Sequence, residues 1–185
     1  PLERKGNIKK TKKILDKVDL ITLRDERSYK TLSEIGIENK NVKVTADPAL
    51  DLDIADEKLG KAILKNEGVP SDKKLLGVSV RKWQNLGGDF ETQIANACDY
   101  AYEKYGYYTV FLPMQSSRDT AIMQNIKRKM KHESAIIKKR YSVEGMLSII
   151  KCFDMCIGMR LHTLIYAAIN SVPLIGLVYD PKINS

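Results

Sequence analysis

Short runs of apolar, often β-branched residues alternate along this chain with longer amphipathic stretches. The apolar runs include Leu75–Val80, Tyr107–Leu112 and Phe153–Met159. Strands that alternate with helices form βαβ units, in which the strands lie parallel and the helices cover the faces of the sheet. The near-continuous apolar character of Leu75–Val80 is typical of a strand buried on both faces. We therefore expect an α/β fold with a mostly parallel sheet and flanking helices.

The same pattern predicts where the individual elements lie. We expect helices at residues 8–17, 26–36, 57–66, 89–104, 116–130, 143–151 and 162–170, and strands at 18–23, 42–46, 75–80, 107–112, 134–138, 153–159 and 173–179. Asp89, Ser142, and either Ser116 or Ser117 are the expected helix N-caps. The aspartate-rich segment at residues 47–56 is the expected linker. It separates residues 1–52 from a second domain at residues 53–185.

The charge of the chain limits its partners. Its 185 residues contain 31 Lys and Arg against 23 Asp and Glu, a formal net charge of +8, which favours anionic partners. The basic runs Lys9–Lys13 and Lys127–His132 have the character of solvated helix faces, although a patch for an anionic lipid or polymer is left open. No apolar run reaches the roughly 18 residues that a membrane span needs, and the first residues have no signal-peptide pattern. We interpret the three cysteines as reduced thiols and expect a cytoplasmic protein, with contact to the inner face of the membrane left open.

Cationic and polar side chains follow several of the predicted strands. Arg24, Arg81 and Gln115 come after the strands at 18–23, 75–80 and 107–112, and Arg160 and His162 follow the strand at 153–159. In an open parallel α/β sheet, ligands bind outside the carboxyl ends of the strands. We therefore expect these side chains to lie on the rim of one site.

The segment GMRLHT, which begins at Gly158, is the strongest of these signals. Gly158 permits a tight turn, and Arg160 and His162 point the same way if the backbone there is still extended. The free N–H groups of the following helix face the same region. This arrangement predicts a cradle for a phosphate or a carboxylate. In the alternative interpretation, Arg160 caps a neighbouring helix and His162 satisfies a hydrogen bond in the core.

Other features favour ordinary structural roles. Arg81 could be a surface arginine, and we expect Trp83 to pack against the protein. Asp25 is suited to cap the helix at 26–36. The aspartates of residues 47–56 fit no metal-binding loop, so we expect no metal site, and His132 receives no role. Leu86–Gly88 is loop material and not a phosphate loop, because neither of the usual glycine-rich motifs occurs.

Five segments together resemble the polysaccharide pyruvyl transferase family. They are ITLRDERS, VTADPAL, GVSVRKW, FLPMQSSRD and IGMRLHTLIYAAINSVPLIGLVYDPK, which occur in the family's order and cover nearly the whole chain. The last segment is the most specific. The resemblance implies a two-domain GT-B architecture. Residues 1–52 would be the end of an N-terminal Rossmann-like domain together with the linker, and residues 53–185 would form most of a C-terminal, donor-binding Rossmann-like domain. Most of the N-terminal domain and the C-terminal tail would then lie outside this sequence, and the fragment alone need not be active.

The resemblance also implies an activity, the transfer of a pyruvyl group from phosphoenolpyruvate to a sugar of a cell-surface polysaccharide precursor as a ketal. No cofactor is implied, and whether the acceptor is lipid-linked is left open. Family contacts to phosphoenolpyruvate match Arg160, Leu161 and His162. We expect His162 to be the general acid or base, because histidine titrates near neutral pH without tuning. Arg160 and Arg81 are the expected phosphate and carboxylate anchors.

Arg24 and Gln115 complete the expected substrate-binding set, while Asp25, Asp47 and Asp119 are candidates for the base that activates the sugar hydroxyl. Two other functions are left open. A nucleotide-sugar glycosyltransferase uses the same scaffold, although Tyr179-Asp180-Pro181 stands where such enzymes carry a ribose-binding glutamate. A non-enzymatic anion-binding module would explain the net charge, but a nucleic-acid partner is disfavoured because aromatic residues do not interleave with the basic runs.

Overall fold

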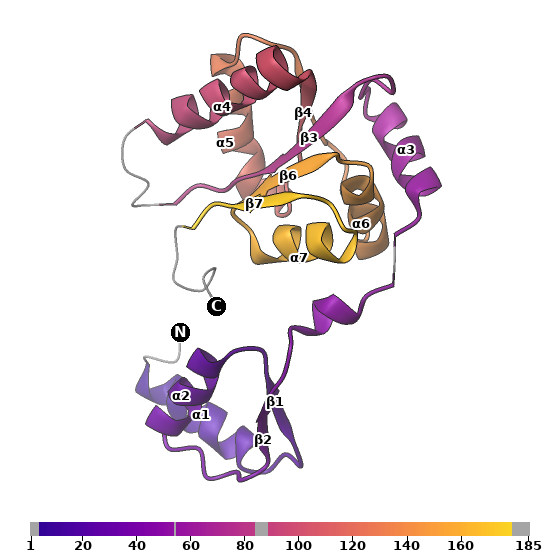
Figure 1. Ribbon diagram of the computed structural model, residues 1–185. Coiled ribbons are helices and arrows are strands. Elements are labelled where there is room, and N and C mark those ends of the chain that lie inside the picture. Colours follow the sequence, from indigo (N-terminus) through magenta and orange to yellow (C-terminus); the bar gives the residue numbers. More distant parts are fainter. Residues whose placement is uncertain (1–3, 54, 84–88, 179–185) are drawn as a thin grey trace. The chain divides into compact units, whose positions relative to one another are not determined.

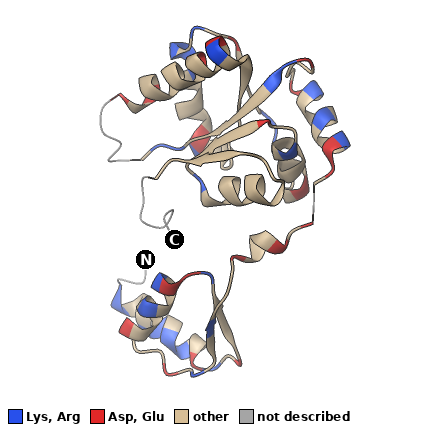
Figure 2. Ribbon diagram, in the orientation of Figure 1, with Lys and Arg blue, Asp and Glu red and all other residues tan. Residues whose placement is uncertain are grey.

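The computed structural model describes residues 4–53, 55–83 and 89–178 (Figure 1). The chain divides into two compact units, Pro1–Asp51 and Leu52–Ser185. None of the described helices is long and apolar enough to cross a membrane. Lys and Arg lie on helices of both units, for example on α1 and α3 (Figure 2).

The described part of the first unit contains two parallel strands, two α-helices and one 3₁₀ helix. Its elements are α1 (Lys5–Leu15), β1 (Ile21–Leu23), α2 (Glu26–Glu34), β2 (Val42–Val44) and a 3₁₀ helix (Pro48–Asp51). The Asp25 side chain accepts a hydrogen bond from the N–H of Ser28 at 2.6 Å, so the expected cap of α2 is confirmed. This bond is the first cause that holds the pKa of Asp25 below its usual range. That this unit ends a larger Rossmann-like domain stays a prediction.

The second unit is a five-stranded parallel sheet covered by helices on both faces, as the sequence predicts. Its elements are α3 (Glu57–Asn66), β3 (Lys74–Ser79), α4 (Phe90–Tyr105), β4 (Tyr107–Phe111), α5 (Ser116–Lys129), β5 (Ser134–Ile136), α6 (Val143–Lys151), β6 (Met155–Gly158), α7 (Leu161–Ile169) and β7 (Leu174–Gly176). The strand order is β5-β4-β3-β6-β7. Helices α4 and α5 pack together on one face, and α3, α6 and α7 cover the other (Figure 1). The expected fold class is confirmed.

Strand β3 is the centre of this sheet. It pairs with β4 on one side and with β6 on the other, both in parallel. Leu76 and Val78 are almost completely buried, as expected for a strand covered on both faces. Gly77 is required there, because a Cβ at this position would lie only 2.1 Å from a ring carbon of Phe153. Aromatic packing directly on the backbone of the central strand thus replaces a side chain.

Several predicted boundaries differ from the observed ones. The strands other than β3 are shorter than expected. β3 keeps the expected length but begins one residue earlier, at Lys74, and α1 begins at Lys5, before residue 8. Asp89 and Ser142 cap α4 and α6 as predicted, through the N–H groups of Thr92 and Gly145. The predicted serine cap of α5 is wrong: Gln115 holds the N-cap position, without a side-chain cap bond, and the helix begins at Ser116. Helix α7 begins at Leu161, one residue earlier than expected, with Arg160 as its N-cap.

Gly60 allows α3 and α6 to approach each other closely. A Cβ at this position would lie 2.0 Å from the backbone oxygen of Ser148 and 2.7 Å from Sγ of Cys152. Backbone atoms cannot move aside as the end of a side chain can. Gly60→Ala should therefore destabilise the protein by about 1–3 kcal/mol, although alanine is the better helix former.

Urea unfolding followed by the fluorescence of Trp83 measures this effect, because Trp83 packs against the core of the second unit. Lys58→Ala, on an exposed position of the same helix, is the control and should stay within about 0.5 kcal/mol of the parent protein. Equal stability of Gly60→Ala and the parent would show that the helices have room to separate.

Glu67, the C-cap residue of α3, joins this helix to the segment before α6. Its carboxylate accepts hydrogen bonds from the N–H groups of Lys138 and Lys139, at 2.8 and 3.2 Å, and from the Tyr141 hydroxyl at 2.7 Å. Partial burial alone would raise the pKa of Glu67, but these donors outweigh it and hold the pKa below its usual range. Burial, followed by the bond to Glu67, raises the pKa of Tyr141 to about 12.

The lowered pKa of Glu67 predicts a dependence of stability on pH. A carboxyl group whose pKa is lower in the folded state stabilises the fold above its usual pKa of about 4.3, and this contribution is lost as the pH falls further. Glu67→Gln should lower the free energy of unfolding by about 1–2 kcal/mol at pH 7 and by less at pH 3. The measurement is urea unfolding at both pH values, with the exposed Glu133→Gln as control. The same loss at both pH values would contradict a role for the charge.

Candidate functional site

The carboxyl ends of β3 and β6 mark a topological switch point of the sheet. These strands are neighbours, but the chain leaves β3 towards α4 on one face and leaves β6 towards α7 on the opposite face (Figure 1). The connections therefore diverge and leave a crevice, the place where ligands bind in open α/β sheets. The hydroxyl of Thr163 in α7 donates to the hydroxyl of Ser79 in β3 at 3.1 Å and ties the two elements together below this crevice.

A pocket of about 360 Å³ opens at this edge of the sheet. It is lined by Arg81 and Lys82 after β3, Arg118 and Asp119 in the first turn of α5, and Arg160 after β6. Three arginines and one lysine against one carboxylate leave an excess of three positive charges. We call these five residues the cationic pocket. Its size and charge suit a compact polyanion.

Arg160 is held in this pocket by a buried carboxylate. Its Nη2 donates to Oδ1 of Asp119 at 2.5 Å, and its Nε donates to Oδ2 at 3.1 Å. The Asp119 side chain is 0% exposed, whereas that of Arg160 is 18% exposed. Nη2 also lies 3.4 Å from Oε1 of Gln115. The guanidinium is therefore fixed in place while one part of it still reaches the pocket.

Arg81 reaches the same pocket from β3. Its guanidinium carbon lies 5.2 Å from the centre of the Trp83 ring, a cation–π distance. Trp83 itself packs against the core, as the sequence predicts. Arg81 and Arg160 therefore line the same pocket from the ends of neighbouring strands, as their positions after these strands predict.

His162 is placed differently from Arg160. It is the second residue of α7 and is exposed, and its ring centre lies 6.2 Å from that of Tyr166. The backbone is extended at Arg160 but helical from Leu161 onward, so the extended geometry that would align the two side chains is absent. Among the described residues, neither His162 nor the half-buried Leu161 lines the cationic pocket.

The remaining predicted binding residues have these positions. Gln115 lies at the N-cap of α5, and its N–H donates to Oδ2 of Asp119 at 2.9 Å. Arg24 belongs to the first unit, where its Nη1 donates to Asp47 at 3.0 Å. Each of the three candidate bases is already engaged, since Asp25 caps α2, Asp47 pairs with Arg24 and Asp119 pairs with Arg160. Tyr179-Asp180-Pro181 and Leu86–Gly88 lie outside the described residues.

Sequence reasoning missed Arg118. It is the third residue of α5 and lies seven residues after the end of β4, whereas Arg81 follows the end of β3 by two residues. Extending the search from each strand end into the first turn of the next helix would have found it. In this segment, the sequence predicts functional roles only for Gln115 and Asp119. The structure brings Arg118 to the pocket because the first turn of α5 sits over the carboxyl ends of the strands.

The three cysteines are poorly suited to act as nucleophiles. Burial raises the pKa of Cys98 and Cys152 to about 11 and that of Cys156 to about 12, so these thiols stay protonated near neutral pH. Within residues 4–53, 55–83 and 89–178, no group of three His, Cys, Asp or Glu side chains is placed to hold a metal ion.

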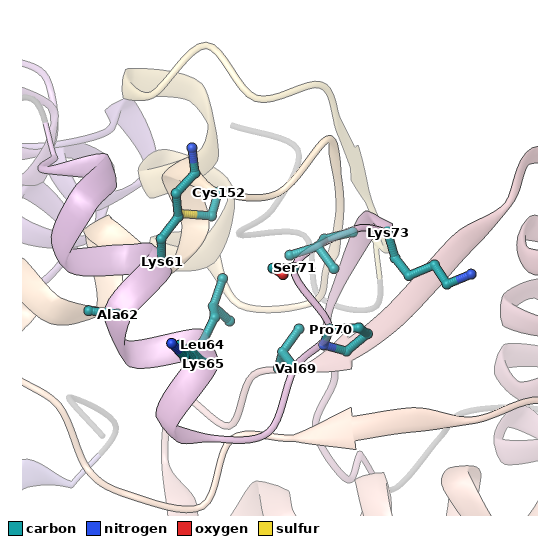
Figure 3. A pocket seen from close by; sticks show the side chains of 10 residues that line it. Lys61, Ala62, Leu64, Lys65, Val69, Pro70, Ser71, Lys73 and Cys152 are labelled. Carbon is teal, nitrogen blue, oxygen red and sulfur yellow. The ribbon is translucent and has the colours of Figure 1, made fainter.

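A larger pocket of about 520 Å³ lies at the opposite, amino end of β3 (Figure 3). Leu64, Val69 and other side chains from α3 and the turn before β3 line it, together with three lysines. Figure 3 shows that the amines of Lys61 and Lys73 point to different sides instead of towards a common centre. Lys61 pairs with Glu57 at 2.7 Å. This pocket therefore lacks the convergent charges of the cationic pocket.

Comparisons with known proteins agree with this fold. A family model described as polysaccharide pyruvyl transferase matches residues 1–181. No curated protein matched the chain.

Similar solved structures include a family 9 glycosyl transferase from Veillonella parvula (13% identity, TM-score 0.57), covering 88% of this chain and 44% of that one. Another is MnaA of S. aureus in complex with UDP (15% identity, TM-score 0.61), covering 86% of this chain and 43% of that one. A third is the wall teichoic acid polymerase TagF (14% identity, TM-score 0.54), covering 97% and 43%. This chain spans less than half the length of these proteins, and the likeness shows a Rossmann-like, GT-B type of fold.

The position of Arg118 predicts a contribution to anion binding. Arg118→Ala should weaken the binding of phosphate-bearing anions about 3- to 10-fold, because one exposed charge interaction contributes about 1 kcal/mol. Calorimetric titration with inorganic phosphate at low salt measures this loss. Arg128→Ala, which removes the same charge from the last turn of α5, is the control and should bind normally. Equal losses in both variants would mean that net charge alone governs binding.

Proposed function

The chain belongs to the polysaccharide pyruvyl transferase family, and on this premise we propose that it binds phosphoenolpyruvate in the cationic pocket as the donor for pyruvyl transfer to a sugar. The acceptor is a sugar of a polysaccharide precursor, and the product is a pyruvate ketal. A cytoplasmic location is part of this proposal, because phosphorylated small metabolites are found there.

The observation that carries the proposal is the excess of positive charge at the switch point of the sheet. Phosphoenolpyruvate bears about three negative charges near neutral pH, and the cationic pocket has an excess of three positive ones. Arginine suits this task because its planar guanidinium binds phosphate and carboxylate oxygens in pairs. Arg160 and Arg81 hold the two anionic groups, while Arg118 and Lys82 add charge at the same pocket.

His162 is the proposed proton-transfer residue. It lies two residues after Arg160, and its imidazole is exposed on the first turn of α7, outside the lining of the cationic pocket. Imidazole gains and loses a proton near neutral pH. The engagement of Asp25, Asp47 and Asp119 in other contacts leaves His162 as the better candidate among the residues named from the sequence.

The proposed reaction balances without a cofactor. A proton adds to the methylene carbon of phosphoenolpyruvate, and a sugar hydroxyl attacks the adjacent C2, losing its proton. The C2–O bond to phosphate then breaks, and a second hydroxyl of the sugar closes the ketal ring. The two sugar hydroxyls release two protons. One of them restores the acid that protonated the methylene carbon, and the other leaves with the phosphate. Cationic side chains favour the breaking of the C2–O bond because they stabilise the departing phosphate.

Ligand binding to the whole protein tests the proposal. Phosphoenolpyruvate should raise the melting temperature in proportion to the logarithm of its concentration above Kd, and a UDP-sugar should not. A shift by the UDP-sugar alone would favour a nucleotide-sugar glycosyltransferase and contradict the donor proposed here.

Two variants separate binding from proton transfer. His162→Ala should reduce kcat at least about 100-fold, the usual contribution of general acid–base catalysis, while phosphoenolpyruvate still raises the melting temperature. Arg160→Lys should raise KM for phosphoenolpyruvate, because the paired geometry of the guanidinium is lost. His132→Ala, on the other histidine of the chain, is the matched control. Near-normal turnover by His162→Ala would exclude the assigned role.

A further inference from the structure

The contact between Arg160 and Asp119 crosses the central strand of the sheet. Asp119 follows β4 and Arg160 follows β6, and β3 lies between these two strands. The paired side chains therefore meet above the carboxyl end of β3, from which Arg81 departs. Residues 41 positions apart in the sequence thus form one wall of the cationic pocket.

Asp119 is unsuited to act on a substrate directly. Its side chain is fully buried, and both of its oxygens accept hydrogen bonds. Arg160 donates to Oδ1 and Oδ2, and the N–H of Gln115 donates to Oδ2. A buried carboxylate with these donors holds its neighbours in one geometry.

We propose that Asp119 is a positioning residue that fixes the guanidinium of Arg160 for anion binding in the cationic pocket. The identity of the anion rests on the function proposed above, but the positioning itself does not. The bonds to Asp119 use Nε and Nη2 of Arg160, and Nη2 also lies 3.4 Å from Oε1 of Gln115. Nη1 takes no part in these contacts, so its N–H groups are left for a ligand.

The physical reason is the cost of ordering an arginine. A long, flexible side chain loses rotamer freedom when it binds a ligand, and this loss weakens affinity. Asp119 orders Arg160 before the ligand arrives. The carboxylate also lowers the local excess of positive charge, so its removal has two opposing effects. The loss of order dominates if the proposal is right, whereas the loss of the negative charge alone would strengthen anion binding.

The test uses Asp119→Asn in the whole protein, which keeps the shape of the side chain and removes its charge. Calorimetric titration with phosphoenolpyruvate and, separately, with inorganic phosphate should show affinities at least about 10-fold weaker than in the parent. The control is Asp99→Asn, the same change at a buried carboxylate that accepts the N–H groups of Lys131 and His132. Asp99→Asn should bind both anions normally, even if it is less stable.

A double-mutant cycle with Arg160→Lys shows whether Asp119 acts through Arg160. Arg160→Lys alone should weaken binding, and adding Asp119→Asn should then cost less than about 3-fold more, because the guanidinium to be positioned is already gone. If Asp119→Asn does not fold, Asp119→Ser replaces it, since the smaller side chain leaves room for water beside Arg160.

Three results would overturn the proposal: unchanged or stronger anion binding by Asp119→Asn, an equal loss in Asp99→Asn, or losses that simply multiply in the cycle. Failure of the proposed function gives a different result. In that case phosphoenolpyruvate binds no better than inorganic phosphate, while the cycle measured with inorganic phosphate still shows the coupling.

Discussion

Parallel hydrogen bonding of β3 to β4 on one side and to β6 on the other is the constraint on which the second unit depends. It buries the central strand on both faces, and the ring of Phe153 packs directly on Gly77. Because the three strands run in the same direction, the residues that follow them meet at one edge. The core and the cationic pocket are therefore consequences of the same pairing.

The pocket also shows how a buried acid organises surrounding cations. Within the described part of the chain, Asp119 is the carboxylate that pairs with the guanidinium of Arg160 and holds it in place. With Asp119, the pocket keeps an excess of three positive charges but gains a fixed geometry. Preorganised charge of this kind binds an anion better than mobile charge, because less freedom is lost on binding.

Much of this arrangement could be predicted from the sequence. The helix at Glu57–Asn66 and the caps at Asp89 and Ser142 agree with the structure because helix periodicity and capping are local properties. The convergence of Arg81 and Arg160 followed from a general rule about parallel sheets. The predictions fail at positions where a shift of one residue changes the assignment. At the start of α5, for example, Gln115 takes the N-cap position that was expected for a serine.

The sequence by itself determined an α/β fold with a parallel sheet and arginines after its strands, because the alternation of apolar runs and amphipathic stretches is written into neighbouring residues. Only the tertiary structure decided the strand order, and with it the partner of Arg160, the presence of Arg118 in the pocket and the place of His162 on an exposed turn of α7. Asp119 follows β4 and Arg160 follows β6, and these two strands lie on either side of β3, which brings the two side chains within pairing distance. That distance depends on packing between remote segments, which no local pattern of residues encodes.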